Sequence, residues 1–191
     1  MTSTEMKTRA REIMSSQMGN LILVFLIYML LLSGASSVTF GLAWLVVLGP
    51  LNLGLASVLL KLEQGDLFTF EELFSGFNDF SRSLVAGLLI SLYTFLWSLL
   101  LVIPGIVAAL SYSMTFFIMK EHPEMDASQA IEASKTMMMG HKWELFGLIF
   151  SFIGWWILCF ITFGLAMIYV MPYVHCAIVV FYQNLKHGSS L

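Results

Sequence analysis

The feature that most constrains this fold is a long uncharged apolar run in the middle of the chain. No Asp, Glu, Lys or Arg occurs between Ser83 and Met119. One helical crossing of the ~30 Å hydrocarbon core of a bilayer takes about 20 apolar residues, so the run is too long for one crossing and long enough for two. Pro104 and Gly105 lie within it and predict a tight turn or a sharp kink. We therefore expect a hairpin of two membrane-spanning helices, over residues 83–103 and 106–119.

The composition of the whole chain also indicates that much of it is surrounded by lipid. Apolar residues make up 59% of the sequence and charged residues only 11%, against about 45–50% and about 25% in soluble domains. A chain of 191 residues cannot bury that much apolar surface in water, because its surface area shrinks too slowly with size. The net charge of −3 argues against nucleic acid, which needs a basic face. The expected partner is therefore the lipid bilayer.

Four further apolar runs complete the pattern, and a polar segment precedes each pair of runs. They cover residues 21–38, 40–62, 145–161 and 165–185. We predict an all-α polytopic membrane protein in which six transmembrane helices form three hairpins. Each hairpin is preceded by an amphipathic helix at the cytosolic interface, and residues 1–191 form a single integral membrane domain.

The polar segments carry the signals of amphipathic helices. The third opens with Asp126 and Gln129, which predict a capping box and a helix running to about His141. Helix-compatible residues over 136–156 then lead into the fifth apolar run without a cluster of turn residues. We therefore expect one continuous helix that runs from the cytosolic interface into the membrane. The first two segments show apolar residues at helical spacing: Met6, Ala10, Ile13 and Met14, then Phe70, Leu73, Phe74, Phe77 and Phe80.

The basic residues determine the expected orientation. All nine lie on one side of the predicted topology, and the connections near 33–39, 104–105 and 162–164 carry none. The positive-inside rule then places both termini in the cytoplasm of a multi-pass protein of the cell membrane. The nine are Lys7, Arg9, Arg11, Lys61, Arg82, Lys120, Lys135, Lys142 and Lys186.

The sequence also allows a cleaved signal peptide at its start and contains an internal repeat. The basic start, the short apolar run and the small residues Ser33-Gly34-Ala35 also fit a cleaved secretory signal. Residues 39–43 recur word for word at 162–166, which supports a threefold repeat over about 1–62, 63–120 and 121–187.

A group of polar residues near the expected mid-bilayer forms the candidate site. His175 is the ionisable residue deepest in a predicted span, and such a residue is a functional hypothesis because charging it there is costly. Kinked helices that free backbone carbonyls near the midplane form solute sites in transporters. A neutral histidine hydrogen-bonded between helices is the plainer alternative. The candidate intramembrane polar site comprises Pro50, Asn52, Tyr112, Ser113, Pro172, Tyr173 and His175.

Other reactive residues carry weaker signals. Cys159 and Cys176 fall in apolar runs and are expected to be buried small hydrophobes. The sequence has no catalytic, metal-binding or nucleotide-binding motif, so we predict no catalytic residue, no metal and no cofactor. Met137–Met139 either face the membrane or form a soft partner-binding surface. The acid and histidine residues that a metal site would use, His122, Glu124, Asp126 and His141, do not have the spacing of a tight site.

Several short segments together resemble a bacterial integral-membrane family, domain of unknown function 975. The chain is more distantly similar to the membrane domain of some glycerophosphodiester phosphodiesterases. The resemblance covers essentially the whole chain, although the family's early tryptophan is missing around Gly19-Asn20. It implies a multi-span bacterial membrane protein and assigns no activity. It is carried by residues 73–77, 103–106, 112–114, 139–142, 144–146, 151–155, Thr162 with Gly164, 172–173 and 181–182.

Three functions fit these observations. The first is a non-enzymatic membrane scaffold that binds lipid, or a cytosolic or membrane protein partner, through its interfacial helices. The second is a small-solute transporter or channel that uses the kinked even-numbered spans, although no buried acidic residue is available to couple ions. The third, a lipid-modifying enzyme at the inner interface, has only His122, Asp126, His141 and Glu144 as candidates.

Overall fold

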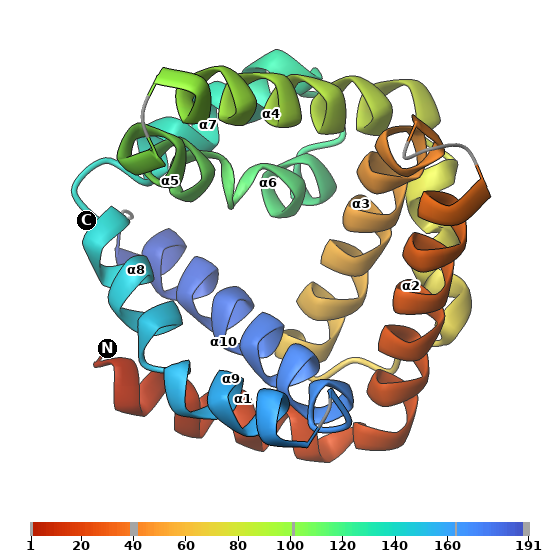
Figure 1. Ribbon diagram of the computed structural model, residues 1–191, viewed down its shortest axis with the longest axis vertical. Helices are drawn as coiled ribbons and strands as arrows, with labels where there is room; N and C mark the ends of the chain where they lie inside the picture. The colour runs from red at the N-terminus through yellow and green to blue at the C-terminus, as the bar shows by residue number, and fades with distance from the viewer. Residues whose placement is uncertain (1, 39–41, 101, 163, 189–191) are drawn as a thin grey trace.

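A computed structural model describes residues 2–38, 42–100, 102–162 and 164–188, and the secondary structure over these residues is entirely helical (Figure 1). Five stretches are long and apolar enough to cross a membrane, and the bent pair formed by α1 and α2 would make a sixth. The elements are α1 (Ser3–Ser16), α2 (Met18–Val38), α3 (Leu42–Gln64), η1 (Phe70–Phe77), α4 (Phe80–Leu100), α5 (Val102–Tyr112), α6 (Thr115–Glu121), α7 (Ala127–Met137), α8 (Lys142–Phe150), α9 (Ile153–Ile161) and α10 (Met167–Gly188).

Several local predictions are confirmed. The buried residues of α1 are the four of its predicted apolar stripe, and α1 meets α2 at a bend of 95°. Asp126 accepts a hydrogen bond from the Gln129 amide at 2.8 Å, and the Asp126 amide donates to the Gln129 side chain at 3.0 Å. This capping box starts α7 where the sequence placed it. Cys159 and Cys176 are buried free thiols.

The prediction of one continuous helix over 136–156 is wrong. Helix α7 ends at Met137, and α8 begins at Lys142. Gly140 lies between them with φ of +86°, a left-handed conformation that glycine adopts without steric cost and that commonly ends helices. A second break at Ser151 and Phe152 separates α8 from α9. The charged and apolar parts therefore change direction where they meet.

The second polar segment also differs from the predicted helix. It is a short 3₁₀ helix, η1, whose period of three turns Leu73 and Gly76 inward against α3. The phenylalanines of the predicted stripe stay partly exposed, by 37–45%. They form a row of aromatic rings, with centroids 6.3 Å apart for Phe74 and Phe77 and 6.4 Å for Phe77 and Phe80.

Pro104 and Gly105 do not form the turn of the second hairpin. Helix α4 ends at Leu100 and α5 begins at Val102, so Pro104 occupies the first helical turn, where proline is tolerated. Gly105 instead allows α5 to approach α4, since a Cβ there would lie 2.9 Å from the Ser98 Cα. Residues 39–41 and 163, which belong to the repeated segment, lie outside the described residues.

The hairpins form a closed ring (Figure 1). Each charged segment packs on the hairpin before it in the ring, so that α1 packs on the last hairpin. The hairpins are α2–α3, α4 with α5–α6, and α8–α9 with α10. Segment η1 packs on α3, and α7 packs on α4, α5 and α6. Helix α1 closes the ring by packing on α10 and α8. The threefold sequence repeat stays a prediction. In all three units, however, the charged segment packs in the same way, on the preceding hairpin.

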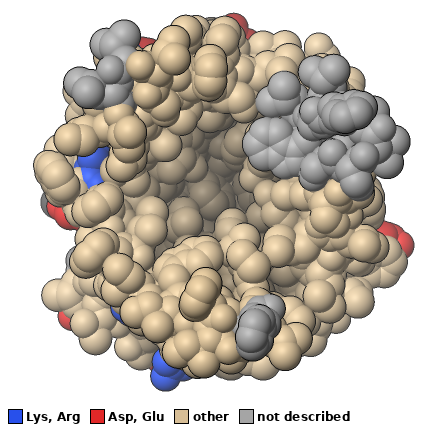
Figure 2. Space-filling view, in the orientation of Figure 1, with Lys and Arg blue, Asp and Glu red and all other residues tan. Residues whose placement is uncertain are grey.

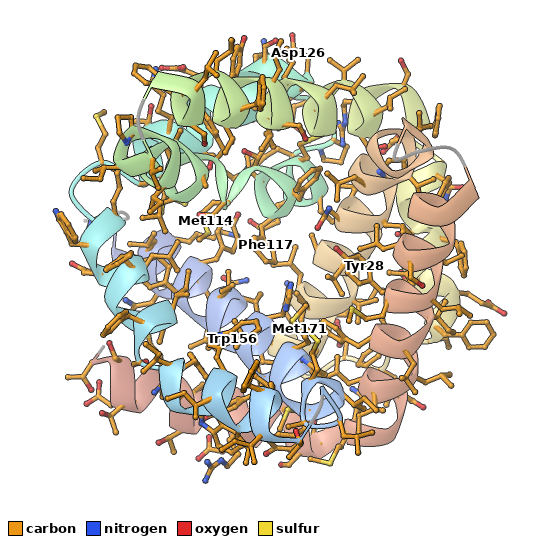
Figure 3. All side chains as sticks on the ribbon, viewed as in Figure 1. Tyr28, Met114, Phe117, Asp126, Trp156 and Met171 are labelled. Carbon is orange, nitrogen blue, oxygen red and sulfur yellow. The ribbon has the colours of Figure 1, made fainter. Side chains whose placement is uncertain are left out.

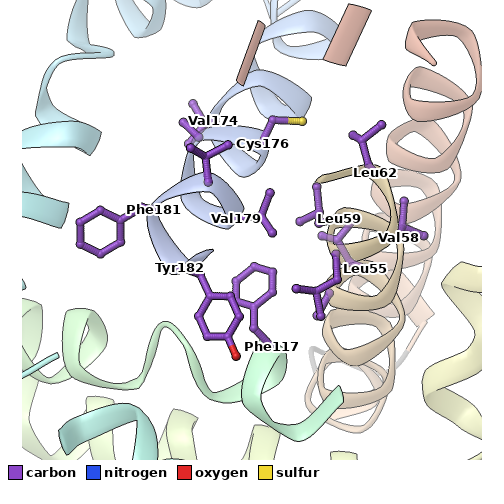
Figure 4. Packing of buried hydrophobic residues seen from close by; sticks show 14 of the residues in the cluster. Leu55, Val58, Leu59, Leu62, Phe117, Val174, Cys176, Val179, Phe181 and Tyr182 are labelled. Atoms are coloured by element: carbon purple, nitrogen blue, oxygen red, sulfur yellow. The ribbon is translucent and has the colours of Figure 1, made fainter. Parts of the chain in front are cut away.

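The hydrophobic core lies where α3, α6 and α10, from the three hairpins, meet (Figure 4). Leu55 and Leu59 of α3 face Val179 of α10 across it. The Phe117 ring of α6 stacks on Tyr182 of α10 with centroids 5.2 Å apart. Tyr182 also donates a hydrogen bond to Glu121 at 2.7 Å.

The outer helices leave much apolar surface uncovered. Exposed fractions reach 87% for Phe160, 79% for Trp143 and 75% for Ile103. Soluble monomers do not expose continuous apolar surface on this scale. The visible face in Figure 2 is largely uncharged, with most charges at its outline, and a hollow opens at its centre.

Candidate functional site

Asn52 of α3 is held by two hydrogen bonds. Its side-chain amide donates to the Leu48 carbonyl at 2.7 Å, and its Oδ1 accepts from the Tyr28 hydroxyl of α2 at 3.4 Å. Pro50 lies inside α3 two residues earlier, and its carbonyl faces η1, where a Cβ on Gly76 would lie 2.0 Å from it. Of these two predicted residues, only Asn52 joins another helix through a side-chain hydrogen bond.

His175 of α10 meets the same face of α2. Its Nδ1 lies 2.9 Å from the Met171 carbonyl. Nδ1 must carry a proton to donate to that carbonyl, so in a neutral ring Nε2 is an acceptor. The ring contacts Phe25 edge-on, with centroids 5.1 Å apart, and Phe25 lies 6.3 Å from Tyr28. The structure thus brings Asn52 and His175 to two adjacent aromatic residues of α2.

This group borders the central hollow. In Figure 3, Tyr28, Met114, Phe117 and Met171 lie around the hollow, and Asp126 lies at the outer edge. Phe25 and Met171, the neighbours of His175, also line an apolar cavity of about 130 Å³. The site therefore combines a few polar atoms with an apolar surround, as small-molecule sites do.

Tyr112 and Ser113 lie elsewhere, at the break between α5 and α6. The Tyr112 ring packs 6.0 Å from that of Tyr93, and the Ser113 hydroxyl donates to the Leu110 carbonyl at 2.8 Å. The break is closed by Ser134 of α7. Its hydroxyl accepts from the Met114 amide at 3.2 Å and donates to the Ser111 carbonyl at 2.8 Å. These contacts satisfy backbone groups that the broken helix leaves without partners.

Tyr173 contacts α1 where α1 closes the ring, and Pro172 is buried beside it inside α10. The Tyr173 hydroxyl donates to the Lys7 carbonyl at 3.2 Å, and the Arg11 guanidinium lies 5.7 Å from the Tyr173 ring centroid. The Lys7 ammonium donates to the Ser151 carbonyl at 2.8 Å, at the break between α8 and α9. The structure therefore does not gather the seven predicted residues in one place.

Sequence reasoning missed two residues that organise these places. Tyr28 has the only side-chain polar atom in the apolar run 21–32, and that isolation was a usable signal. Ser134 falls on the buried stripe of α7 with Ala127, Ala130 and Ile131, so helical spacing marks it as a buried hydroxyl that needs partners.

The charged residues form pairs rather than a catalytic cluster. His122 Nδ1 lies 2.9 Å from Glu124, and His141 Nδ1 lies 3.2 Å from Glu144. Over the described part of the chain, no three His, Cys, Asp or Glu residues are grouped so that they could hold a metal ion.

One ion pair joins η1 to α3. The Lys61 ammonium lies 2.5 Å from the Glu72 carboxylate, and the Ser57 hydroxyl donates to the same carboxylate at 3.4 Å. The hydrogen bond from Lys61 holds the pKa of Glu72 below its ordinary value. The pair therefore depends on Glu72 being ionised.

The family described as protein of unknown function (DUF975) matches the chain over residues 1–111 and again over residues 98–189. The chain belongs to this family. The two matched ranges overlap, and together they span nearly all of it. Comparison with curated proteins found no match, and comparison with solved structures found none either. The description of the DUF975 family assigns no activity.

Proposed function

We propose that this chain is a non-enzymatic scaffold of the bacterial cell membrane, with six spans and both termini in the cytoplasm. It binds lipid or a protein partner through α1, η1 and α7. The observation that carries this proposal is that apolar and charged helical segments occur side by side in one fold. Helices with exposed apolar surfaces form a ring, and three charged segments pack against it.

The charged segments support binding because one side of each is anchored and the other is exposed. On α7, Ser134 is buried, whereas the Glu132 and Lys135 side chains are 68% and 53% exposed. On α1, Ile13 is buried, whereas Glu12 keeps 62% of its side chain exposed. A docked helix loses little further freedom on binding, which favours recognition by its outer face.

The position of α7 alongside α4 favours a tilted second hairpin. Arg82, at the start of α4, donates to the Met125 carbonyl just before α7 at 3.1 Å. Lys135, near the end of α7, lines a cavity with Trp97, near the end of α4. Helix α7 thus runs alongside α4. An upright α4 would carry exposed Glu132 into the hydrocarbon core, at a cost of several kcal/mol. We therefore propose that the second hairpin crosses the membrane at a tilt that keeps α7 at the interface.

Site-specific photocrosslinking in native membranes tests the scaffold proposal. A photoreactive residue replaces Glu132 on the exposed side of α7, and the matched control replaces Phe160, which is 87% exposed on the apolar surface. We expect a discrete partner or an enriched lipid species at position 132, and only bulk lipid at position 160. The same bulk lipid at both positions, and at equivalent positions of α1 and η1, would contradict the proposal.

Solute binding in the central hollow is the second candidate function. It is favoured by the hollow of Figure 2 and by the polar group of Tyr28, Asn52 and His175 near it. A thermal-stability screen of the purified protein against small solutes tests it. A solute that stabilises wild type but not His175→Leu or Asn52→Leu supports transport. A folded His175→Leu variant that matches wild type with every solute and lipid removes this candidate.

A further inference from the structure

The seam between the second and third hairpins, where α5 faces α8, contains the larger of two adjoining cavities. Its volume is about 550 Å³, within the range of about 300–1,000 Å³ that small-molecule sites occupy. Its lining is almost wholly apolar, and Lys142 supplies the one charged side chain. The lining residues are Ile103, Ile106, Val107, Leu110, Met139, Gly140, Lys142, Trp143 and Phe146.

A smaller cavity of about 170 Å³ adjoins the first and shares Val107 and Lys142 with it. Lys135, Ser111 and Tyr112 add polar groups to the mostly apolar lining of this second cavity, and neither cavity is lined by a carboxylate. Figure 2 shows one small blue area at the left of the visible face, with red atoms beside it at the outline.

Lys142 lies half-buried between the two cavities without a counter-ion. None of the residues that the structure describes forms a hydrogen bond or an ion pair with its ammonium group. Lys135 has a carboxylate partner, Glu132 at 3.4 Å, but both of those side chains are exposed. The ligand that best fits a half-buried ammonium next to an apolar cavity is an amphiphilic anion. Its charge pairs with the ammonium, and its apolar part fills the cavity.

We propose that the two cavities together bind one anionic phospholipid. An acyl chain fills the larger cavity, and the headgroup phosphate occupies the smaller one, against Lys142 and Lys135. Basic pockets between membrane helices bind acidic headgroups in this way, and Trp97 and Trp143 flank the site as aromatic residues do at membrane interfaces. The proposal rests on the membrane location proposed above, and it adds a lipid class and a binding site.

Lipid-dependent thermal stabilisation of the full-length protein in a neutral detergent tests this site. The probes are phosphatidylglycerol, phosphatidylcholine and inorganic phosphate. We expect phosphatidylglycerol to stabilise the wild type at lower concentration than phosphatidylcholine does, and phosphate alone to have no effect. Lys142→Gln should weaken the phosphatidylglycerol effect about fivefold, and Lys142→Arg should retain it. Ile106→Trp, which fills the larger cavity, should weaken it as well.

Lys186→Gln is the matched control, because it removes one positive charge from the exposed end of α10, outside both cavities and outside the three charged segments. It should leave the response to phosphatidylglycerol unchanged. An equal loss in Lys186→Gln and Lys142→Gln would show charge attraction without a site and would overturn the proposal. Stabilisation by inorganic phosphate would also overturn it, in favour of a soluble anion. A lipid response unchanged in Lys142→Gln refutes the site alone, since the crosslinking result at Glu132 is independent of it.

Discussion

At the residue scale, buried hydroxyl groups take the place of helical hydrogen bonds that the backbone has lost. Ser134 bonds both backbone groups at the α5–α6 break and is fully buried. Ser134→Ala leaves the Met114 amide and the Ser111 carbonyl without that partner, which should cost about 1–3 kcal/mol. The midpoint of thermal unfolding in detergent measures the effect. Ser128→Ala, at an exposed position of the same helix, should leave it unchanged, and equal midpoints for both variants would contradict this account.

The Glu72 pair predicts a pH dependence of stability. Because Lys61 holds the pKa of Glu72 below its ordinary value of 4.5, the pair contributes stability above that pH. The contribution is lost as the pH falls through the lowered folded-state value. Unfolding midpoints measured on acidification should therefore fall more steeply for wild type than for Glu72→Gln. Glu71→Gln, at the exposed neighbouring position, should follow wild type, and parallel curves for wild type and Glu72→Gln would rule out the effect.

At the element scale, glycine allows η1 and α3 to touch through their backbones. A Cβ on Gly54 would lie 1.8 Å from the Leu73 carbonyl oxygen, so Gly54→Ala must displace η1. We expect a loss of about 1–3 kcal/mol or more from overpacking, together with faster amide hydrogen exchange across η1.

Gly147→Ala is the control for this substitution. Gly147 lies inside α8 with nothing within 4 Å of an added Cβ, so alanine there should be neutral or stabilising by up to about 1 kcal/mol. If Gly54→Ala exchanges η1 amides at the wild-type rate, the close approach of α3 and η1 does not hold the segment in place.

At the scale of the whole molecule, the ring and the charge distribution predict a sidedness. Single cysteines at Ser128 on α7 and at Leu165 between α9 and α10 test it, in a background in which Cys159 and Cys176 are replaced by alanine. A membrane-impermeant thiol reagent should label position 165 in intact cells and position 128 only after permeabilisation. Labelling of position 128 from outside would contradict the proposed orientation.

Much of this fold was predictable because it depends on local chemistry. The helices, the buried stripe of α1 and the Asp126 cap follow from spacing and capping within one turn. The break at Gly140 was not predicted, because glycine is compatible with both a helix and a left-handed turn. The candidate site was only partly predictable. Asn52 and His175 both contact the face of α2 that carries Phe25 and Tyr28. Tyr173 instead forms a hydrogen bond with α1.

The sequence by itself determined the helical class of this protein and its long apolar helices. Long uncharged apolar runs are compatible with a membrane, where hydrogen bonds within each segment would require helices. The tertiary structure alone decided which segments meet. Each charged segment packs on the hairpin before it, and α1 closes the ring on α10. Local periodicity shows which face of a helix is apolar. It does not show which other element packs against that face. Close approaches such as that of Gly54 to Leu73, and buried bonds such as those of Ser134, decide that partner.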